Sequence, residues 1–259
     1  MKIQIDYHGK RVFVTDSASG LGRSIAEGFH ESGATVAIND PSTDRVLKTI
    51  QEMGDGARLI AAPGDLTQCT QIRPTVERAV AAMTQLDVLV CSTVRGDLCP
   101  VDKVTADYWQ GVLAANVKSA FFTAQACAPE LKKTRGCIVN VASVIGLLGG
   151  PPGSVVYSTA KGTMIHMSRM MALELAQDGI RVNSFCPGWI DAPAPRTGMD
   201  AFGYGALREY IASRSPLGRI ATSDECVAAV LYLAASVASY TTGATLIADG
   251  GLTSGHYIP

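Results

Sequence analysis

Two side chains with complementary chemistry stand four residues apart in this chain of 259 residues. Tyr157 and Lys161 belong to the segment Tyr-Ser-Thr-Ala-Lys, and Ser143 precedes the tyrosine by fourteen positions. On a helix, positions i and i+4 lie on one face, so the phenol and the ammonium can share a site. Because a nearby ammonium favours the phenolate, we expect Lys161 to lower the pKa of Tyr157 from its usual value of about 10. Such a tyrosine can act as a general acid or base, while the Ser143 hydroxyl holds a carbonyl or alcohol oxygen.

Short apolar segments alternate with amphipathic ones along the whole chain. Strands are expected at 11–15, 34–38, 58–62, 86–91, 136–141, 180–186 and 245–248. Helices are expected at 21–32, 44–53, 72–83, 105–132, 157–177 and 224–235. Strands separated by helices predict βαβ units and a mostly parallel sheet. We therefore predict an α/β fold, a Rossmann-like doubly wound sheet of about seven strands with helices on both faces, in a single domain over residues 1–259.

The turn after the first predicted strand has the composition of a dinucleotide site. Gly20 and Gly22 open the following helix, where free backbone N–H groups and the positive helix end attract a pyrophosphate. Asp40 ends the second strand about twenty residues further on, where a carboxylate accepts a hydrogen bond from a ribose 2′-hydroxyl and repels a 2′-phosphate. No Arg or Lys lies in the turn or immediately after Asp40. This pattern favours NAD over NADP; the alternative is an ordinary turn in which Asp40 only starts a bend before Pro41.

Several motifs in one order resemble the short-chain dehydrogenase/reductase family over residues 9–253. They are the glycine turn, Asp65-Leu66, Asn116, Asn140 to Ser143, Tyr157 with Lys161, Arg181 to Asn183, Cys186 to Gly188 and Asp249 to Gly251. The resemblance implies that Tyr157 is the catalytic acid or base and that Ser143 orients the substrate oxygen. It also implies that Lys161 holds the nicotinamide ribose and that Asn116 anchors a water of a proton relay.

The same resemblance predicts the cofactor-binding residues. Asp65 would contact the adenine through its side chain and Leu66 through its backbone, and the segment from Pro187 to Ile190 would line the nicotinamide. The full predicted set is Ser17, Ser19, Gly20, Leu21, Gly22, Asp40, Asp65, Leu66, Tyr157, Lys161, Pro187, Gly188 and Ile190. The implied cofactor is NAD. A homotetramer or homodimer is implied too, because the 105–132 helix and the Tyr157 helix pair with their copies in this family.

The chain departs from the family pattern at four places, two of which, Ala142 and Ala192, are single alanines in place of hydroxyl residues. The other two belong to the adenosine end of the predicted site. Asp16 stands where the family has a glycine in the turn. Cys91-Ser92-Thr93-Val94 replaces Asn-Asn-Ala-Gly after the fourth strand, which removes the asparagine hydrogen bonds and the conformational freedom of the glycine. The charge of Asp16 either weakens cofactor binding or reaches a ribose hydroxyl, and both interpretations are kept.

Composition argues against several other classes of protein. The net charge is −1 and no Lys/Arg cluster stands out, so electrostatic binding to nucleic acid or to an anionic membrane is not indicated. The apolar stretches are too short to span a bilayer, and the N-terminus lacks the apolar core of a secretion signal. Seven scattered cysteines indicate reduced thiols, and four isolated histidines offer no metal-ligand pair. We expect a cytoplasmic protein without a metal.

Three functional hypotheses follow. The first is an NAD-dependent oxidoreductase that interconverts a secondary alcohol and a ketone. The second is an NADPH-dependent oxoacyl-type reductase, against which Asp40 argues; the third is a non-catalytic NAD-binding regulator, which the altered segments favour. The small-molecule substrate would lie under a mostly apolar loop at about 189–215. Arg95 and Arg196 are candidate contacts for a substrate carboxylate, with solvated surface arginines as the alternative.

Overall fold

The strands and helices alternate as the sequence predicts. The computed structural model describes residues 5–54, 56–191 and 204–255. In this described part, seven parallel strands form one sheet in the order β3-β2-β1-β4-β5-β6-β7. The strands are β1 (Arg11–Val14), β2 (Thr35–Ile38), β3 (Leu59–Ala61), β4 (Val88–Cys91), β5 (Cys137–Val141), β6 (Arg181–Pro187) and β7 (Thr245–Ala248). The strand order reverses between β1 and β4, and a doubly wound sheet opens its ligand crevice at that point, at the carboxyl ends of the strands.

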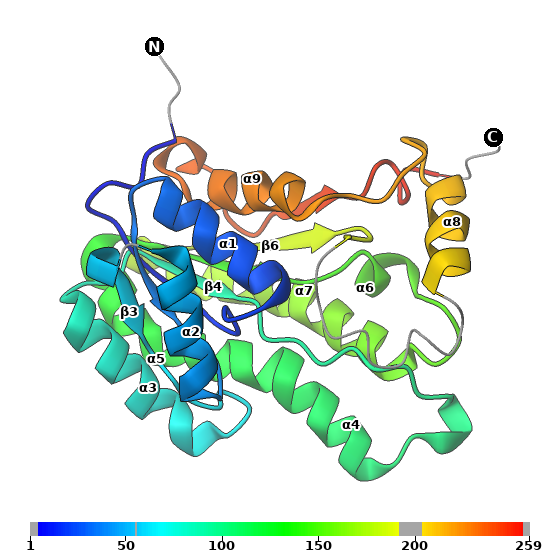
Figure 1. Cartoon of the computed structure of the whole chain (residues 1–259), viewed down its shortest axis with the longest axis horizontal. Helices are drawn as coiled ribbons and strands as arrows, with labels where there is room; N and C mark the ends of the chain where they lie inside the picture. Colours follow the sequence, from blue (N-terminus) through cyan, green and yellow to red (C-terminus); the bar gives the residue numbers. More distant parts are fainter. Residues whose placement is uncertain (1–4, 55, 192–203, 256–259) are drawn as a thin grey trace.

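Helices cover both faces of the sheet (Figure 1). One face carries α1 (Gly20–Glu31), α2 (Thr43–Met53) and α9 (Ser223–Ala234). The other face carries α3 (Cys69–Met83), α5 (Ser119–Thr134) and α7 (Val155–Leu175), with α4 (Ala106–Leu113) packed against α7. Alternate strand residues point to opposite faces, so Phe13 packs under α3 and α5 while its neighbours Val12 and Val14 pack under α1 and α9.

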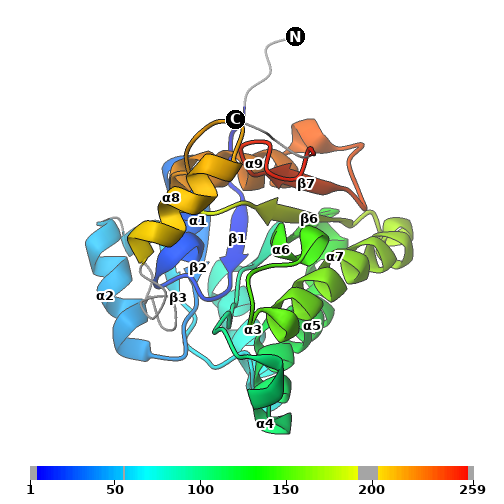
Figure 2. The same cartoon turned by 90° about the vertical axis from the view of Figure 1, so that its right-hand side faces the viewer.

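Shorter helices complete the chain. Short α6 (Ile145–Leu148) and α8 (Tyr204–Arg214) lie at the end of the molecule that faces the viewer in Figure 2. The 3-10 turns are η1 (Gly56–Arg58), η2 (Val101–Lys103), η4 (Ala176–Asp178) and η6 (Ser236–Ala238). The predicted loop at 189–215 therefore contains a helix in its described part, whereas residues 192–203, Arg196 among them, lie outside the described residues.

The long predicted helix at 105–132 is interrupted. It consists of α4, a π-helical turn η3 (Ala114–Lys118) and α5. A π-turn adds one residue to a helical turn, and such turns occur often at functional sites. Apolar periodicity over a long helix does not resolve one inserted residue, so the sequence predicted a single helix here.

Within the described residues, no helix combines the length and apolarity needed to cross a membrane. The His, Cys, Asp and Glu side chains of that part form no group of three or more that could hold a metal ion. The seven cysteines carry free thiols.

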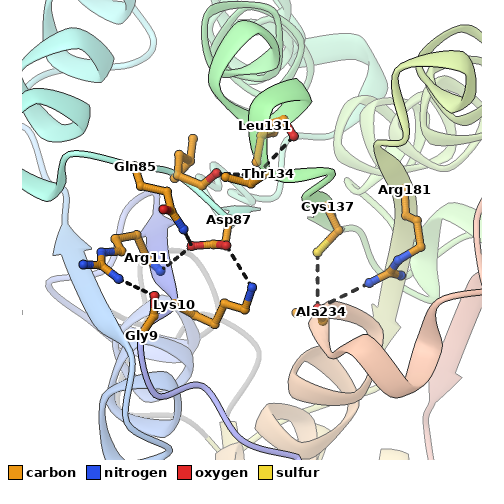
Figure 3. A network of polar contacts seen from close by, with 11 residues as sticks. Gly9, Lys10, Arg11, Gln85, Asp87, Leu131, Thr134, Cys137, Arg181 and Ala234 are labelled. Atoms are coloured by element: carbon orange, nitrogen blue, oxygen red, sulfur yellow. Dashed lines mark hydrogen bonds and ion pairs between the residues drawn. The ribbon is translucent and has the colours of Figure 1, made fainter.

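Polar side chains tie the strands together at the amino edge of the sheet (Figure 3). Asp87, which precedes β4 and is buried, accepts hydrogen bonds from Lys10 Nζ at 3.0 Å, from the Arg11 backbone N–H at 2.9 Å and from Gln85 Nε2 at 2.8 Å. Arg181, at the start of β6, donates to the last carbonyl groups of α9. These contacts fix the amino edge, and the residues predicted to do chemistry lie at the opposite, carboxyl edge.

Candidate active site

Tyr157 and Lys161 lie on one face of α7, as their spacing predicts. The Lys161 Nζ atom is 5.7 Å from the centroid of the Tyr157 ring. It donates a hydrogen bond to the Val141 carbonyl oxygen, at the end of β5, at 2.8 Å. Ser143 follows the same strand by two residues, and its hydroxyl is close enough to the Tyr157 phenol to lower the pKa of that group through a hydrogen bond. The three side chains predicted to do the chemistry therefore meet at the carboxyl edge of β5.

Burial shifts the pKa values of this pair in the directions that disfavour charge. It raises the pKa of Tyr157 to about 12, an effect that the hydrogen bond with Ser143 only partly offsets. It lowers the pKa of Lys161 to about 8. The expectation that Lys161 lowers the tyrosine pKa is therefore wrong for this structure, because loss of solvent outweighs a charge 5.7 Å from the ring centre. At neutral pH, Tyr157 is a neutral phenol and Lys161 an ammonium.

Asn116 lies in the π-helical turn η3. Its Nδ2 atom donates to the Arg95 and Val112 carbonyl oxygens, each at 2.9 Å, so the amide fixes the segment after β4 against α4. Its Oδ1 atom is buried and has no hydrogen-bond partner among the described residues. Buried polar atoms are nearly always hydrogen-bonded, so this oxygen fits the predicted role of Asn116 in holding a water.

The turn between β1 and α1 allows close approach of the backbone. Gly20 has a φ of 57°, in the left-handed region that favours glycine. A Cβ atom at Gly22 would collide with the Asp16 carbonyl oxygen and lie 2.9 Å from Ser92 Oγ, so only glycine fits there. Ser19 makes no side-chain hydrogen bond to cap α1. The first N–H groups of α1, at Gly20, Leu21 and Gly22, are therefore placed to bind a phosphate.

Asn39, which sequence reasoning missed, holds this turn from beneath. Its Oδ1 atom accepts a hydrogen bond from the Asp16 N–H at 3.2 Å, and its Nδ2 atom donates to the Ala62 carbonyl oxygen at 2.8 Å. The Ser17 hydroxyl accepts from the Asn39 N–H and donates to the Val14 carbonyl oxygen. Ser17, predicted to bind cofactor, is thus fully buried and supports the turn from within. An amide at the end of an apolar strand was the signal available for Asn39.

A cavity of about 470 Å³ opens beside this turn. Its walls include Asp16, Arg45, Asp65, Leu66, Val94 and Arg95. The two residues predicted to contact adenine, Asp65 and Leu66, therefore share one cavity with Asp16. Arg95, considered for a substrate carboxylate, lies on the wall of this cavity and pairs with Asp97 at 3.2 Å.

Asp40 follows the end of β2 by two residues and is almost fully buried. Its Oδ1 atom accepts hydrogen bonds from the Ser42 N–H at 2.7 Å and from Arg45 Nε at 2.9 Å. Its Oδ2 atom has no partner in the described part of the chain. The sequence showed no basic residue immediately after Asp40, but the first turn of α2 folds Arg45 back onto this carboxylate.

The segment after β4 keeps a hydrogen-bond network despite the loss of its asparagines. The backbone N–H groups of Ser92 and Thr93 both donate to Thr15 Oγ1, at 2.9 and 3.2 Å. The Ser92 hydroxyl also donates to the Thr15 carbonyl oxygen. Hydroxyl groups thus join the ends of β1 and β4, and the expected loss of hydrogen bonds is limited to the asparagine side chains themselves.

The segment from Pro187 to Ile190 runs along the carboxyl edge next to Ser143. The Pro187 carbonyl oxygen accepts a hydrogen bond from the Val144 N–H at 3.1 Å, and the Gly188 N–H donates to β7. Ile190 forms a single bridge to the loop before α9. This is the position predicted for the nicotinamide side of the site.

A parallel sheet with a glycine turn after β1 and a Ser, Tyr and Lys group after β5 defines a nucleotide-binding oxidoreductase. Residues 16–253 match the family model described as enoyl-(acyl carrier protein) reductase. The chain therefore belongs to the short-chain dehydrogenase/reductase family, whose members bind a nicotinamide cofactor and act on CH–OH groups of small molecules.

Individual relatives align with this protein over almost the whole chain. Meso-2,3-butanediol dehydrogenase of Serratia marcescens is 31% identical over 248 residues, 96% of each chain. A 3-oxoacyl-(acyl-carrier-protein) reductase of Thermotoga maritima is 34% identical over 247 residues, which cover 94% of this chain and 98% of the relative. The crystal structure of gluconate 5-dehydrogenase from Burkholderia cenocepacia, in complex with NADP and tartrate, aligns with a TM-score of 0.90 at 27% identity. That alignment covers 97% of this chain and 98% of the other.

Proposed function

We propose that this protein is an NAD-dependent oxidoreductase that interconverts a secondary alcohol and a ketone. Tyr157 is the acid or base, and Ser143, Lys161 and Asn116 assist it. The observation that carries the proposal is the meeting of Tyr157 with Ser143 and Lys161 at the carboxyl edge of β5. A relative named for a 2,3-diol supports a secondary alcohol as the substrate class.

Two features support a dinucleotide at the first turn. One is the glycine cradle, where a side chain at Gly22 would collide with the backbone of the turn. The other is the unpaired Oδ2 atom of Asp40, which would accept a hydrogen bond from a ribose 2′-hydroxyl. Asp65, Leu66 and the segment from Pro187 to Ile190 would hold the adenine and nicotinamide ends.

The side chains move the proton that accompanies hydride transfer, while the bound nicotinamide gives or takes the hydride. During reduction, the neutral Tyr157 donates its hydroxyl proton to the carbonyl oxygen of the substrate; during oxidation, it accepts the alcohol proton. The Ser143 hydroxyl donates a hydrogen bond to the same substrate oxygen and stabilises its developing negative charge. The Lys161 ammonium stabilises the phenolate that remains when Tyr157 has given up its proton.

A second candidate is an NADPH-dependent oxoacyl-type reductase. Arg45, at the adenosine end of the cavity, could contact a 2′-phosphate, and one relative is named as a 3-oxoacyl reductase. Asp40 argues against this candidate, because its carboxylate repels a 2′-phosphate.

We also expect a homotetramer or homodimer formed through α5 and α7. The outer faces of these helices carry apolar side chains that a partner subunit would cover. They are Phe121, Phe122, Met170 and Leu173, which are 39%, 37%, 44% and 73% exposed. Light scattering after size-exclusion chromatography measures the subunit number, and a monomer would contradict this expectation.

A panel of secondary alcohols and ketones, assayed with both cofactors, tests the proposal. We expect turnover with NAD or NADH on some panel members, and a loss of about a hundredfold or more in Tyr157→Phe with unchanged NADH binding by fluorescence titration. Tyr232→Phe, at an exposed tyrosine on α9, is the matched control and should keep full activity. Turnover that prefers NADPH would favour the oxoacyl reductase. Tight NADH binding without any turnover would favour a non-catalytic regulator.

A further inference from the structure

Asp16 places a carboxylate in the cofactor turn where the family pattern has glycine. We propose that Asp16 is a second specificity-determining residue of the adenosine-ribose subsite. Its carboxylate accepts a hydrogen bond from a ribose hydroxyl and, together with Asp40, excludes a cofactor that carries a 2′-phosphate. This inference rests on the proposed function, because it concerns the cofactor of the same site.

The backbone of Asp16 is held in a conformation that side chains seldom adopt. Its φ is 51°, in the left-handed region, which aspartate and asparagine tolerate better than other non-glycine residues. The Asp16 N–H donates to Asn39 Oδ1 at 3.2 Å, and its carbonyl oxygen lies against Gly22. The backbone of Asp16 is therefore held in place beside the turn that is expected to bind the phosphates.

Asp16 lies on the wall of the 470 Å³ cavity, which Arg45 and Asp65 also line. Burial and the charge of Asp40 raise the pKa of Asp16, whereas a hydrogen bond from the Val94 backbone and the charges of Arg45 and Lys161 lower it. Arg45 lines this cavity and pairs with Asp40, the residue expected to meet the adenosine ribose. A carboxylate on the same wall, close enough to feel the charges of Asp40 and Arg45, is placed to meet that ribose as well.

Asp40 alone does not decide against a 2′-phosphate in this protein. Arg45 pairs with it, with Nη2 2.7 Å from Oδ1, so the two side chains together carry no net charge. The Arg45 side chain is 58% exposed and lines the cavity, where it could turn toward a phosphate. No Lys or Arg of the described residues forms an ion pair with Asp16. Asp16 therefore restores a net negative charge at the subsite, which repels the two negative charges of a 2′-phosphate.

The two departures from the family pattern contact each other and form one unit. Val94, in place of the family glycine, lines the same cavity as Asp16, and its backbone N–H is close enough to lower the pKa of the Asp16 carboxyl. The hydrogen bonds of Ser92 and Thr93 to Thr15 hold that backbone in place. The segment after β4 therefore helps to hold the carboxylate of Asp16, which itself belongs to the turn between β1 and α1. Such support is expected of a side chain that binds a ligand.

Cofactor binding by Asp16→Asn and Asp16→Gly tests the inference. Asparagine keeps the shape and tolerates the positive φ, and glycine restores the family residue without strain. Fluorescence titration gives the ratio of the NADPH Kd to the NADH Kd at fixed pH and salt. We expect this ratio to fall about tenfold or more in both variants, because NADH loses a charged hydrogen bond and NADPH loses a repulsion. Asp44→Asn, which removes an exposed charge from the first turn of α2, is the matched control and should leave the ratio unchanged.

A double variant isolates the contribution of Arg45. Adding Arg45→Ala to Asp16→Asn should abolish any gain in NADPH binding, because the exposed Arg45 guanidinium is the group that would hold the 2′-phosphate. A ratio that changes less than about threefold in the Asp16 variants, or equally in Asp44→Asn, overturns the inference. A parent protein that binds NADPH more tightly would contradict the proposed NAD dependence instead, and the change of ratio on removing the carboxylate would still decide the role of Asp16.

Discussion

The buried charge of Lys161 has a cost in stability that can be measured. Lys161 is 2% exposed, and burial lowers its pKa from 10.5 to about 8. Unfolding returns the side chain to water, so between about pH 8 and pH 10.5 the unfolded chain binds more protons than the folded protein. Stability therefore rises with pH through this window. Lys161→Met keeps a similar side-chain length and removes the charge.

The size of the effect follows from the difference of about 2.5 between the two pKa values, which corresponds to about 3 kcal/mol. This cost is fully present below about pH 8 and disappears as the pH rises through 10.5. At pH 9.5 about 2 kcal/mol of it is gone. Lys161→Met also loses the hydrogen bond to the Val141 carbonyl oxygen. That loss lowers the stability of the variant at both pH values, so it cancels when the two are compared. The stability advantage of the variant over the parent should therefore shrink by about 2 kcal/mol between pH 7 and pH 9.5.

Urea unfolding at fixed protein concentration, followed by circular dichroism, measures this difference at both pH values. Lys48→Met on α2 is the control, because the Lys48 side chain is 75% exposed, and its difference from the parent should stay within a few tenths of a kcal/mol. A Lys161→Met difference that is the same at pH 7 and pH 9.5 would refute the reasoning. The variant should also lose turnover, so that one substitution gains stability and removes function.

Two further predictions concern opposite edges of the sheet. Asp87→Ala leaves the Arg11 N–H without its acceptor and should lower the free energy of unfolding by about 2–4 kcal/mol, whereas Asp87→Asn, which keeps an acceptor, should cost about 1 kcal/mol. Urea unfolding tests both variants, and equal costs would argue against the unpaired N–H as the cause. Because the pKa of Asp16 is raised, acidification should protonate it early and lower the ratio of the NADPH Kd to the NADH Kd. Titrations across the acid range should show a steeper change in the parent than in Asp16→Asn, and parallel curves would contradict this.

Local periodicity was enough to predict the fold and the geometry of the catalytic group. A helix places Tyr157 and Lys161 on one face whatever surrounds it, and the strand–helix alternation determines the class of sheet. The direction of the pKa shifts was not predictable in this way. The burial of Lys161 and the partial burial of Tyr157 depend on how α7 packs on β5, and that packing is a tertiary property.

The sequence also failed to reveal two features that depend on contacts between segments distant in the chain or on local chain reversal. Arg45 reaches Asp40 because Ser42 caps α2 and turns the chain back, which spacing alone does not reveal. Asn39 joins β2 to the first turn and to the end of β3, three segments that are distant in sequence. A polar residue at a strand end has many local uses, so its partners become visible only when the sheet is assembled.

The two ends of the site are therefore determined by different parts of the structure. At the catalytic end, Ser143, Tyr157 and Lys161 are placed by β5 and α7, and moving any of them would disturb the packed core. At the adenosine end, Asp16 and Val94 lie in the loops after β1 and β4, and Arg45 lies in the first turn of α2. Substitutions at these positions change charge without changing the sheet. A structure at a TM-score of 0.90 that holds NADP shows that this fold accommodates the phosphorylated cofactor. If our proposal holds, cofactor preference in this protein depends on a few residues at the adenosine end, and it can change while the proton-transfer group stays the same.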